Sequence, residues 1–219
     1  MSNSENFILD TIEPEVADSI VSSRRDAFAK YGKLALVGSA PIVLAMASKE
    51  AFAAGGLPQQ VVDVLNFALT LEYLEAAFYK KGNGTKGLIP TRYRALFKTI
   101  GAHETAHVAL LKGALGAAAV AAPAVDFTAG GKYADAFSNF QTFATLSATF
   151  EDLGVAAYKG QAGNLAGTPV LTTALHIHSV EARHASAVRP LISKAGWDDA
   201  FDKPKTKNEV LAAATPFLA

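Results

Sequence analysis

The strongest constraint on the fold lies in the stretch Ile100–Leu111, where one glutamate and two histidines interrupt an apolar pattern of helical period. Read from His103, the stretch is His-Glu-x-x-His, the zinc peptidase signature, with two histidines one helical turn apart. Read from Glu104, it is Glu-x-x-His, with His107 as the partner, which forms one half of a dinuclear carboxylate site in a four-helix bundle. The two interpretations make different demands on the remaining sequence, so the remaining sequence can decide between them.

The composition favours a globular helical protein whose metal chemistry depends on carboxylates and histidines. Half of the 219 residues are apolar, which is enough for a substantial core. Twenty basic and twenty acidic residues give a net charge of zero, which provides no electrostatic reason to expect nucleic acid or an anionic membrane surface as a partner. Because the chain has no cysteine, disulfides, thiolate metal sites and cysteine nucleophiles are excluded.

Residues 1–53 are predicted to form a leader that resembles a twin-arginine export signal. Arg24 and Arg25 precede an apolar run at 34–48, and residues 51–53 have the small-x-small form of a signal peptidase site. Two residues, rather than the usual one, separate the arginine pair from the next phenylalanine, so an uncleaved anchor or a structured arm stays open as the alternative. A spanning helix is not expected, since 15 residues fall short of the roughly 20 needed. The prediction is an exported protein, periplasmic or extracellular, with the leader either cleaved or retained.

Four long segments after the leader carry apolar residues at the three-and-four spacing of helices, and prolines and glycines delimit them. Their connections are short, long and short, which predicts an all-α bundle of two antiparallel hairpins joined by a crossover. We expect the bundle to occupy residues 54–196 and a C-terminal tail, 197–219, to pack on its outside. The expected helices cover residues 58–80, 91–118, 133–160 and 168–195, with a short helix at 207–214.

A weak internal repeat relates the first and third expected helices. Each carries a glutamate on the apolar face, followed seven residues later by a tyrosine. An ionised carboxylate buried in such a face costs several kcal/mol unless it is paired or bound to a metal, so these glutamates indicate a metal site. The repeated pairs are Glu72 with Tyr79 and Glu151 with Tyr158.

The second and fourth expected helices share the pattern Glu-x-x-His. Residues at i and i+3 lie on one side of a helix, about 4.5 Å apart along its axis, so each pair can present an oxygen and a nitrogen to one site. Four carboxylates and two neutral imidazoles approximately balance two divalent ions, and this hard donor set favours iron or manganese. The predicted metal ligands are Glu72, Glu104, His107, Glu151, Glu181 and His184.

Residues 64–79, read as Val-Leu-Asn-Phe-Ala-Leu-Thr-Leu-Glu-Tyr-Leu-Glu-Ala-Ala-Phe-Tyr, carry a family resemblance. Together with the leader, they resemble the ferritin-like family, in the branch that includes plant desiccation-related proteins and exported bacterial relatives. The resemblance covers residues 58–195 and implies a ferritin-like four-helix bundle with the six ligands named above. It also places Tyr79 where ferritins keep a tyrosine near the metals, but it does not define the activity of this branch.

Several polar residues lie near the predicted ligands without a fixed role. Glu75 is a candidate for a spare carboxylate near the metals, with an ordinary polar residue at the bundle edge as the alternative. His178 is a candidate partner of a ligand, with a histidine bonded within the core as the alternative. His103 and His176 are expected beside the ligands or at the surface.

The leading functional hypothesis is oxidant handling in stress protection by a possible di-metal oxidoreductase, ferroxidase-like or resembling catalases and peroxidases. Its substrate would be a small oxidant, oxygen or peroxide. Tyr79 and Tyr158 are candidate redox-active neighbours, although aromatic core packing is the default for both.

Two alternatives remain. A non-catalytic structural or desiccation-protective protein would use the metal for stability or for a homo-oligomeric assembly. A zinc metallopeptidase acting through His103, Glu104 and His107 is the minor alternative, because it leaves Glu72, Glu151 and the second Glu-x-x-His unexplained. An iron-storage cage is disfavoured, since no carboxylate-rich mineral surface is evident in the sequence.

Overall fold

The computed structural model describes residues 56–197 and 199–219. The predicted leader, with its arginine pair and cleavage site, lies outside the described residues. Among the described residues, no helix is both long enough and apolar enough to cross a membrane.

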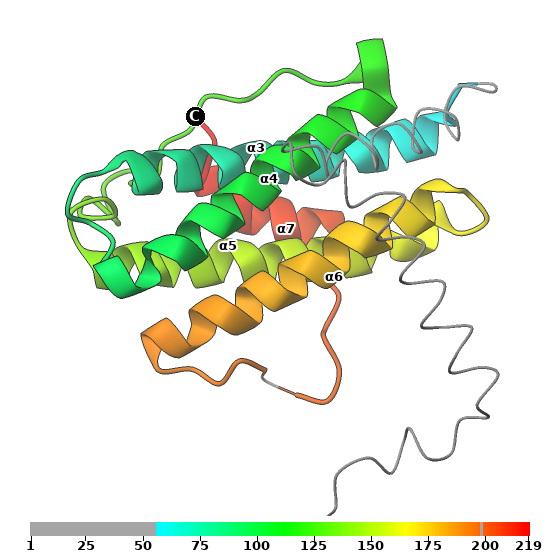
Figure 1. Ribbon diagram of the computed structural model, residues 1–219. Helices are drawn as coiled ribbons and strands as arrows, with labels where there is room; N and C mark the ends of the chain where they lie inside the picture. Colours follow the sequence, from blue (N-terminus) through cyan, green and yellow to red (C-terminus); the bar gives the residue numbers. More distant parts are fainter. Residues whose placement is uncertain (1–55, 198) are drawn as a thin grey trace, which may run out of the picture. The chain divides into compact units, whose positions relative to one another are not determined.

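The described residues contain five α-helices and no β-strand, which confirms the all-α prediction (Figure 1). α3 packs most extensively against α4, and α5 against α6, so the chain forms the two predicted hairpins. The crossover between α4 and α5 runs along the bundle as an irregular segment. The helices are α3 (Gln59–Gly84), α4 (Arg94–Leu115), α5 (Phe140–Gln161), α6 (Val170–Val188) and α7 (Lys207–Ala214).

The third long helix begins later than the sequence predicted. It was expected from about residue 133, but α5 starts at Phe140, after a series of turns. The Asn139 side chain accepts a hydrogen bond from the backbone N–H of Gln141 and so caps the helix. Asn139 has extended backbone angles, which an N-cap requires and an interior helical residue does not adopt.

The fourth long helix ends earlier than predicted, at Val188 instead of about residue 195. Pro190 has no backbone N–H and its ring crowds the preceding turn, so the chain continues as a 3₁₀ turn, Arg189–Ile192. Ser193 then adopts a left-handed conformation with φ of 60° and ends the helical segment. α3, by contrast, continues four residues past its predicted end and stops at Gly84.

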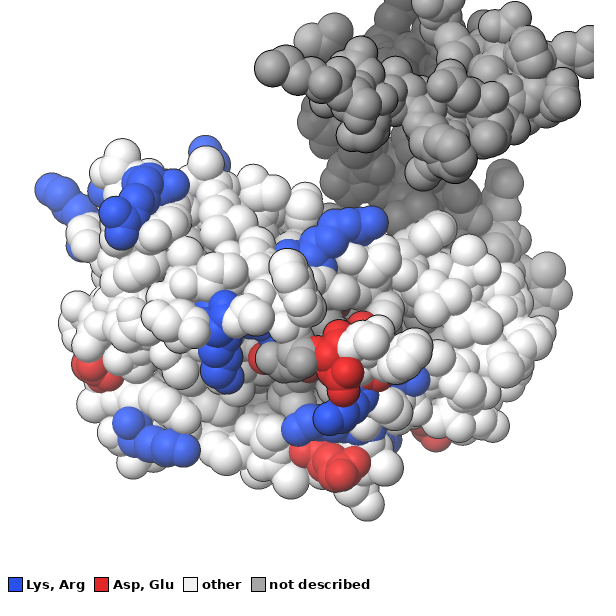
Figure 2. Space-filling model, turned by 90° about the horizontal axis from the view of Figure 1, so that it is seen from below, with Lys and Arg blue, Asp and Glu red and all other residues white. Residues whose placement is uncertain are grey.

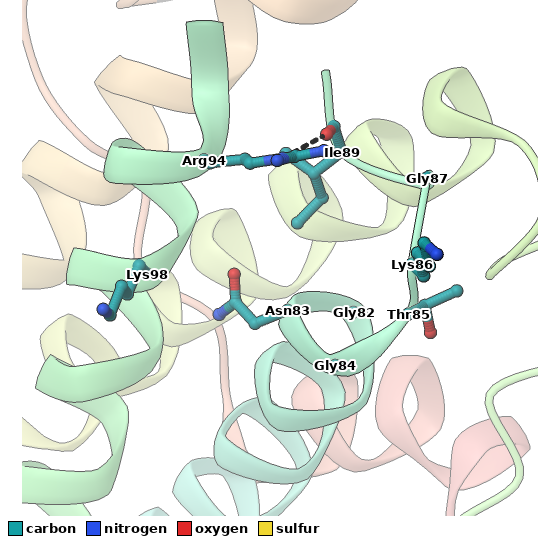
Figure 3. A pocket seen from close by; sticks show the side chains of 9 residues that line it. All are labelled: Gly82, Asn83, Gly84, Thr85, Lys86, Gly87, Ile89, Arg94 and Lys98. Atoms are coloured by element: carbon teal, nitrogen blue, oxygen red, sulfur yellow. Dashed lines mark hydrogen bonds between the residues drawn. The ribbon is translucent and has the colours of Figure 1, made fainter. Parts of the chain in front are cut away.

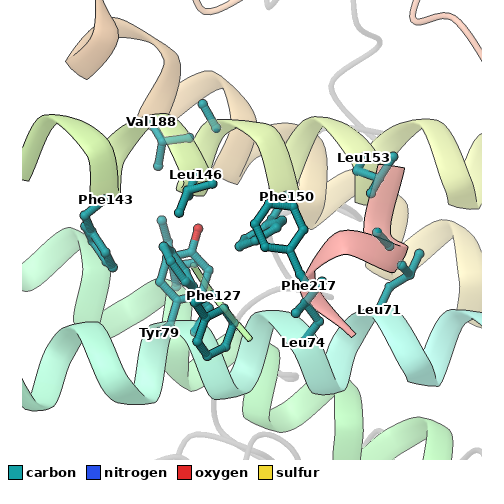
Figure 4. Packing of buried hydrophobic residues seen from close by; sticks show 14 of the residues in the cluster. Leu71, Leu74, Tyr79, Phe127, Phe143, Leu146, Phe150, Leu153, Val188 and Phe217 are labelled. Atoms are coloured by element: carbon teal, nitrogen blue, oxygen red, sulfur yellow. The ribbon is translucent and has the colours of Figure 1, made fainter. Parts of the chain in front are cut away.

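Aromatic side chains fill one half of the core, between the helices of the two hairpins (Figure 4). The ring of Phe78 stacks on Phe143 at a centroid distance of 4.8 Å and meets Phe150 edge-on at 5.0 Å. Phe217 of the C-terminal segment packs edge-on against Phe150 at 4.9 Å. These contacts hold the end of the chain against α5, beside the crossover.

The loop that precedes α7 lies directly on α5. The backbone N–H of Lys205 donates to the carbonyl of Ala156, 3.1 Å away. At Gly160 the two backbones come so close that a methyl group would overlap the carbonyl oxygen of Lys205. α7 follows from a capping box between Thr206 and Glu209 and packs against α5.

Candidate metal centre

The bundle brings all six predicted ligands together in its interior. α3 and α5 each supply one glutamate, and α4 and α6 each supply a Glu-x-x-His pair. All six side chains are buried, and the most accessible of them is only 8% exposed. The structure therefore gathers groups that are far apart in sequence into one cluster, which we call the six-residue cluster: Glu72, Glu104, His107, Glu151, Glu181 and His184.

The six-residue cluster divides into two groups of four that could each hold one ion. Within each group, one donor atom from every residue lies within 4.8 Å of the others. The two groups share Glu104 and Glu181, so these two carboxylates belong to both candidate sites. One group is Glu72, Glu104, His107 and Glu181, and the other is Glu104, Glu151, Glu181 and His184.

His107 faces three carboxylates through a single ring nitrogen. Its Nδ1 lies 3.2, 3.1 and 3.0 Å from one oxygen each of Glu72, Glu104 and Glu181. One N–H group cannot donate to all three oxygens with good geometry, so hydrogen bonding does not explain the arrangement. A cation does, because donors held about 2.1 Å from one ion at right angles lie about 3.0 Å apart.

His184 repeats this arrangement in the second group. Its Nδ1 lies 3.0 Å from Glu104 Oε1, 3.1 Å from Glu151 Oε2 and 3.9 Å from Glu181 Oε2. Glu104 therefore turns one oxygen to each histidine, and Glu181 does the same. Carboxylates that present one oxygen to each of two sites suit a bridged pair of ions.

Three buried oxygens of the cluster accept no hydrogen bond of good geometry from the described residues. They are both oxygens of Glu181 and Oε1 of Glu104. Some of these oxygens lie close to a histidine nitrogen, but the N–H bond does not point towards them well enough for a hydrogen bond. Buried polar atoms without a partner are costly, and a cation bound to these oxygens would remove that cost. The donor set and the unpartnered atoms both fit a metal centre.

Two tyrosines donate hydrogen bonds to the two cluster glutamates that belong to only one four-residue group, Glu72 and Glu151. The Tyr158 hydroxyl on α5 donates to Glu72 Oε1 on α3, 2.6 Å away. Tyr79 on α3 donates in the same way to Glu151 Oε1 on α5. Burial and the nearby carboxylates raise the pKa of both tyrosines well above the usual value, so both remain protonated donors. The internal repeat of the sequence thus becomes a reciprocal pair of hydrogen bonds across the bundle.

The metal-free cluster shares protons among its members. Burial raises the pKa of Glu104 to about 7 and that of Glu181 to about 8, and neighbouring carboxylates add to both shifts. Burial lowers the pKa of His184, but the nearby carboxylates of Glu104 and Glu151 outweigh burial and raise the pKa to about 10. The carboxylates around His107 likewise raise its pKa despite burial. Protons in the metal-free cluster therefore take the place that cations would occupy.

His103 does not join the cluster as the peptidase hypothesis requires. No group of three or more metal-compatible residues in the described part of the chain includes it. Its Nδ1 lies 2.9 Å from Nε2 of His184, the ring nitrogen opposite the carboxylates, and the two rings stack. His103 is exposed, so it covers the outer edge of His184 from the solvent side. The sequence indicated a neighbouring or surface role for it but not this partner.

The other candidate residues take different positions. His178 has a buried Nε2 without a hydrogen-bond partner among the described residues, and no contact joins it to the six-residue cluster. Burial lowers its pKa, and the charge of Asp202 opposes this shift while that of Lys159 adds to it. His176 is exposed. Glu75, by contrast, is buried beside the cluster, with 3% of its surface exposed.

A pocket opens beside the end of α3, and no residue of the six-residue cluster lines it (Figure 3). It has a volume of about 430 Å³ at the turn between α3 and α4, and Arg94 donates to the Ile89 carbonyl at its edge. Its lining includes Lys86 and Lys98 but no acidic residue and no cluster residue. The pocket therefore does not provide an opening to the cluster.

The fold and the cluster define a class of protein: a four-helix bundle with carboxylates and histidines gathered in its interior. The sequence model of the ferritin-like domain matches residues 60–194. This match spans more than half of the chain, so the protein belongs to the ferritin-like domain family, and the predicted family is confirmed. A search of curated proteins finds no match. The narrower branch of desiccation-related and exported bacterial relatives stays a prediction.

Proposed function

We propose that the protein is a dinuclear metalloprotein that binds two iron or manganese ions through bridging carboxylates and handles oxygen or peroxide in stress protection. The observation that carries the proposal is the pair of four-residue groups that share Glu104 and Glu181. Four carboxylates and two neutral imidazoles would balance two divalent ions, and this oxygen-rich donor set suits iron or manganese. The buried position of the cluster would keep the ions away from bulk water.

The chain's own groups would have distinct tasks in such a centre. Glu104 and Glu181 would link the two ions, while Tyr79 and Tyr158 orient the two glutamates that belong to only one four-residue group through their hydrogen bonds. His103 would fix the orientation of the His184 ring through the nitrogen that faces away from the ions. Two redox-active ions, when bound, would supply the electrons for oxygen or peroxide chemistry.

Metal analysis of protein purified from its native compartment, with oxygen and peroxide assays, tests the proposal. We expect two ions per chain. Glu104→Ala should lose both, because both four-residue groups contain Glu104. His103→Ala should keep both ions, whereas a zinc peptidase that uses His103 would lose its metal. Wild-type protein that carries no metal, and whose stability Glu104→Ala leaves unchanged, would defeat the proposal.

A structural or desiccation-protective role is the second candidate, and the deep burial of the cluster supports it. None of the six residues is more than 8% exposed, and the pocket between α3 and α4 does not reach them. The assays separate the two functions. Bound metal that raises the melting temperature, without oxygen or peroxide turnover, would favour the structural role.

The distribution of charge gives no reason to expect a polyanion as the partner. Basic and acidic side chains on the face seen in Figure 2 lie interspersed among uncharged residues. The net charge of the chain is zero. A polyanion such as nucleic acid would require a basic surface, so we do not propose one as a partner.

We also propose export through the twin-arginine-like leader. Replacement of Arg24 and Arg25 by lysine, followed by cell fractionation, would test this proposal.

A further inference from the structure

Glu75 is a buried carboxyl group that has no hydrogen bond or ion pair within residues 56–197 and 199–219. It is 3% exposed and lies one turn after Glu72 on α3. Burial and the charges of the four cluster glutamates raise its pKa well above its ordinary value. A carboxyl group at a position that is only 3% exposed is costly to bury in its charged form, so core packing alone does not explain Glu75.

The second half of the internal repeat has a glycine where α3 has this carboxyl group. Gly154 follows Glu151 by three residues on α5, as Glu75 follows Glu72 on α3. A methyl group at Gly154 would lie 3.2 Å from Glu181 Oε2 and 3.4 Å from Glu75 Oε1. Both oxygens therefore face the space that the missing side chain leaves.

We propose that Glu75 is a fifth carboxylate ligand of the two-ion centre, which reaches the ions between α3 and α5 through the space beside Gly154. The inference rests on the two-ion function proposed above. Glu181 Oε2, the other oxygen that faces this space, is buried and accepts no hydrogen bond from the described residues. Glu75 belongs to neither four-residue group as the side chains stand, so its carboxylate would have to turn towards Glu181 to share a cation with it. The α3 half of the repeat would then supply two carboxylates and the α5 half only one, so the centre is asymmetric.

The variant Glu75→Gln tests this assignment. The full chain is freed of metal with a chelator and titrated with Mn²⁺, and calorimetry measures the binding. The amide has nearly the same size but cannot act as an anionic ligand. The metal-free variant should melt close to the wild-type temperature, because the amide fills the volume of the carboxyl group. Its affinity for at least one of the two Mn²⁺ ions should fall by about tenfold or more. Asp63→Asn makes the same change at an exposed position of α3 and should leave both affinities unchanged.

Gly154→Ala provides a second test that leaves every carboxylate in place. The added methyl group would crowd Glu181 Oε2 and fill the space in front of Glu75 Oε1, so Mn²⁺ affinity should fall here too. Gly113→Ala, in open space on α4, is the matched control and should bind Mn²⁺ as the wild type does.

The outcomes separate this inference from the function on which it rests. Wild-type Mn²⁺ affinity in Glu75→Gln would overturn the fifth ligand, and wild-type affinity in Gly154→Ala would overturn the path beside the glycine. If Glu75→Gln did not fold, the same titration of Glu75→Asp, which keeps the charge but shortens the side chain, would decide: wild-type affinity would overturn the fifth ligand. A wild-type chain that binds neither Mn²⁺ nor Fe²⁺ would defeat the two-ion function itself, and this inference with it.

Discussion

Removal of one tyrosine hydroxyl should weaken one metal position and leave the other nearly intact. Tyr158→Phe deletes the 2.6 Å hydrogen bond to Glu72 Oε1 without changing the packing of the ring. Both partners are buried, and a hydrogen bond to a charged group contributes about 1.5–3 kcal/mol. Without this bond, Glu72 is no longer held towards His107. We therefore expect the affinity for the ion at this position to fall about 10- to 100-fold.

Stepwise Mn²⁺ calorimetry measures this effect, and the internal repeat supplies a second variant. Tyr79→Phe removes the equivalent bond to Glu151 and should weaken the other binding step. The double variant should weaken both steps, because the two tyrosines contact different four-residue groups. Tyr73→Phe removes a 3.3 Å bond to the Val120 carbonyl at the surface and should change neither step.

The result that would refute this reasoning is specific. If Tyr158→Phe bound both ions with wild-type affinity, the hydrogen bond would not orient a metal ligand. If either single variant weakened both steps equally, the division into two four-residue groups would be wrong.

The remaining predictions concern pH and backbone packing. The folded-state pKa of His184 is about 10 against an ordinary value of 6.5, so its stabilising proton is fully present below pH 6.5 and is lost as the pH rises towards 10. The melting temperature of the metal-free protein should fall over that range, while the increase caused by Mn²⁺ should be larger at pH 8.5 than at pH 6, because Mn²⁺ displaces protons from its ligands. Calorimetric melts with and without Mn²⁺ check both trends, and a metal-free melting temperature that rises with pH would contradict the linkage. Gly160→Ala should lower the free energy of unfolding by about 1–3 kcal/mol in urea, because its methyl group meets the Lys205 carbonyl. Gly113→Ala, whose methyl group meets no neighbour, should instead be neutral or stabilise by up to about 1 kcal/mol, and equal losses in both variants would count against the close contact.

The helix boundaries show where local sequence patterns stop being informative. Apolar spacing predicted a helix from about residue 133, because it records which residues face the core and not which backbone hydrogen bonds form. The Asn139 side chain accepts from Gln141 and starts α5 seven residues later than predicted. At the other end of the hairpin, Pro190 ended α6 before the apolar pattern did. Capping and proline geometry outweighed periodicity in both cases.

The sequence by itself determined which side chains could meet within one helix. Glu104 with His107, and Glu181 with His184, share a helical face because 3.6 residues complete a turn, and this local geometry holds wherever the helix packs. The apolar surroundings of all four also predicted that they face the core, where the structure places the glutamates at 0% exposure. The all-α fold and its two hairpins followed from the same periodicity and from the lengths of the connections.

Only the tertiary structure decided how these groups meet across helices. It made Glu104 and Glu181 the carboxylates that the two four-residue groups share, and it placed His103 against His184 on another helix. It also left His178 apart from the cluster, although the sequence made it a candidate neighbour. The reason is that periodicity fixes direction around one helix axis, whereas distances between helices depend on their axial offset and rotation. Those are set by the packing of the whole core.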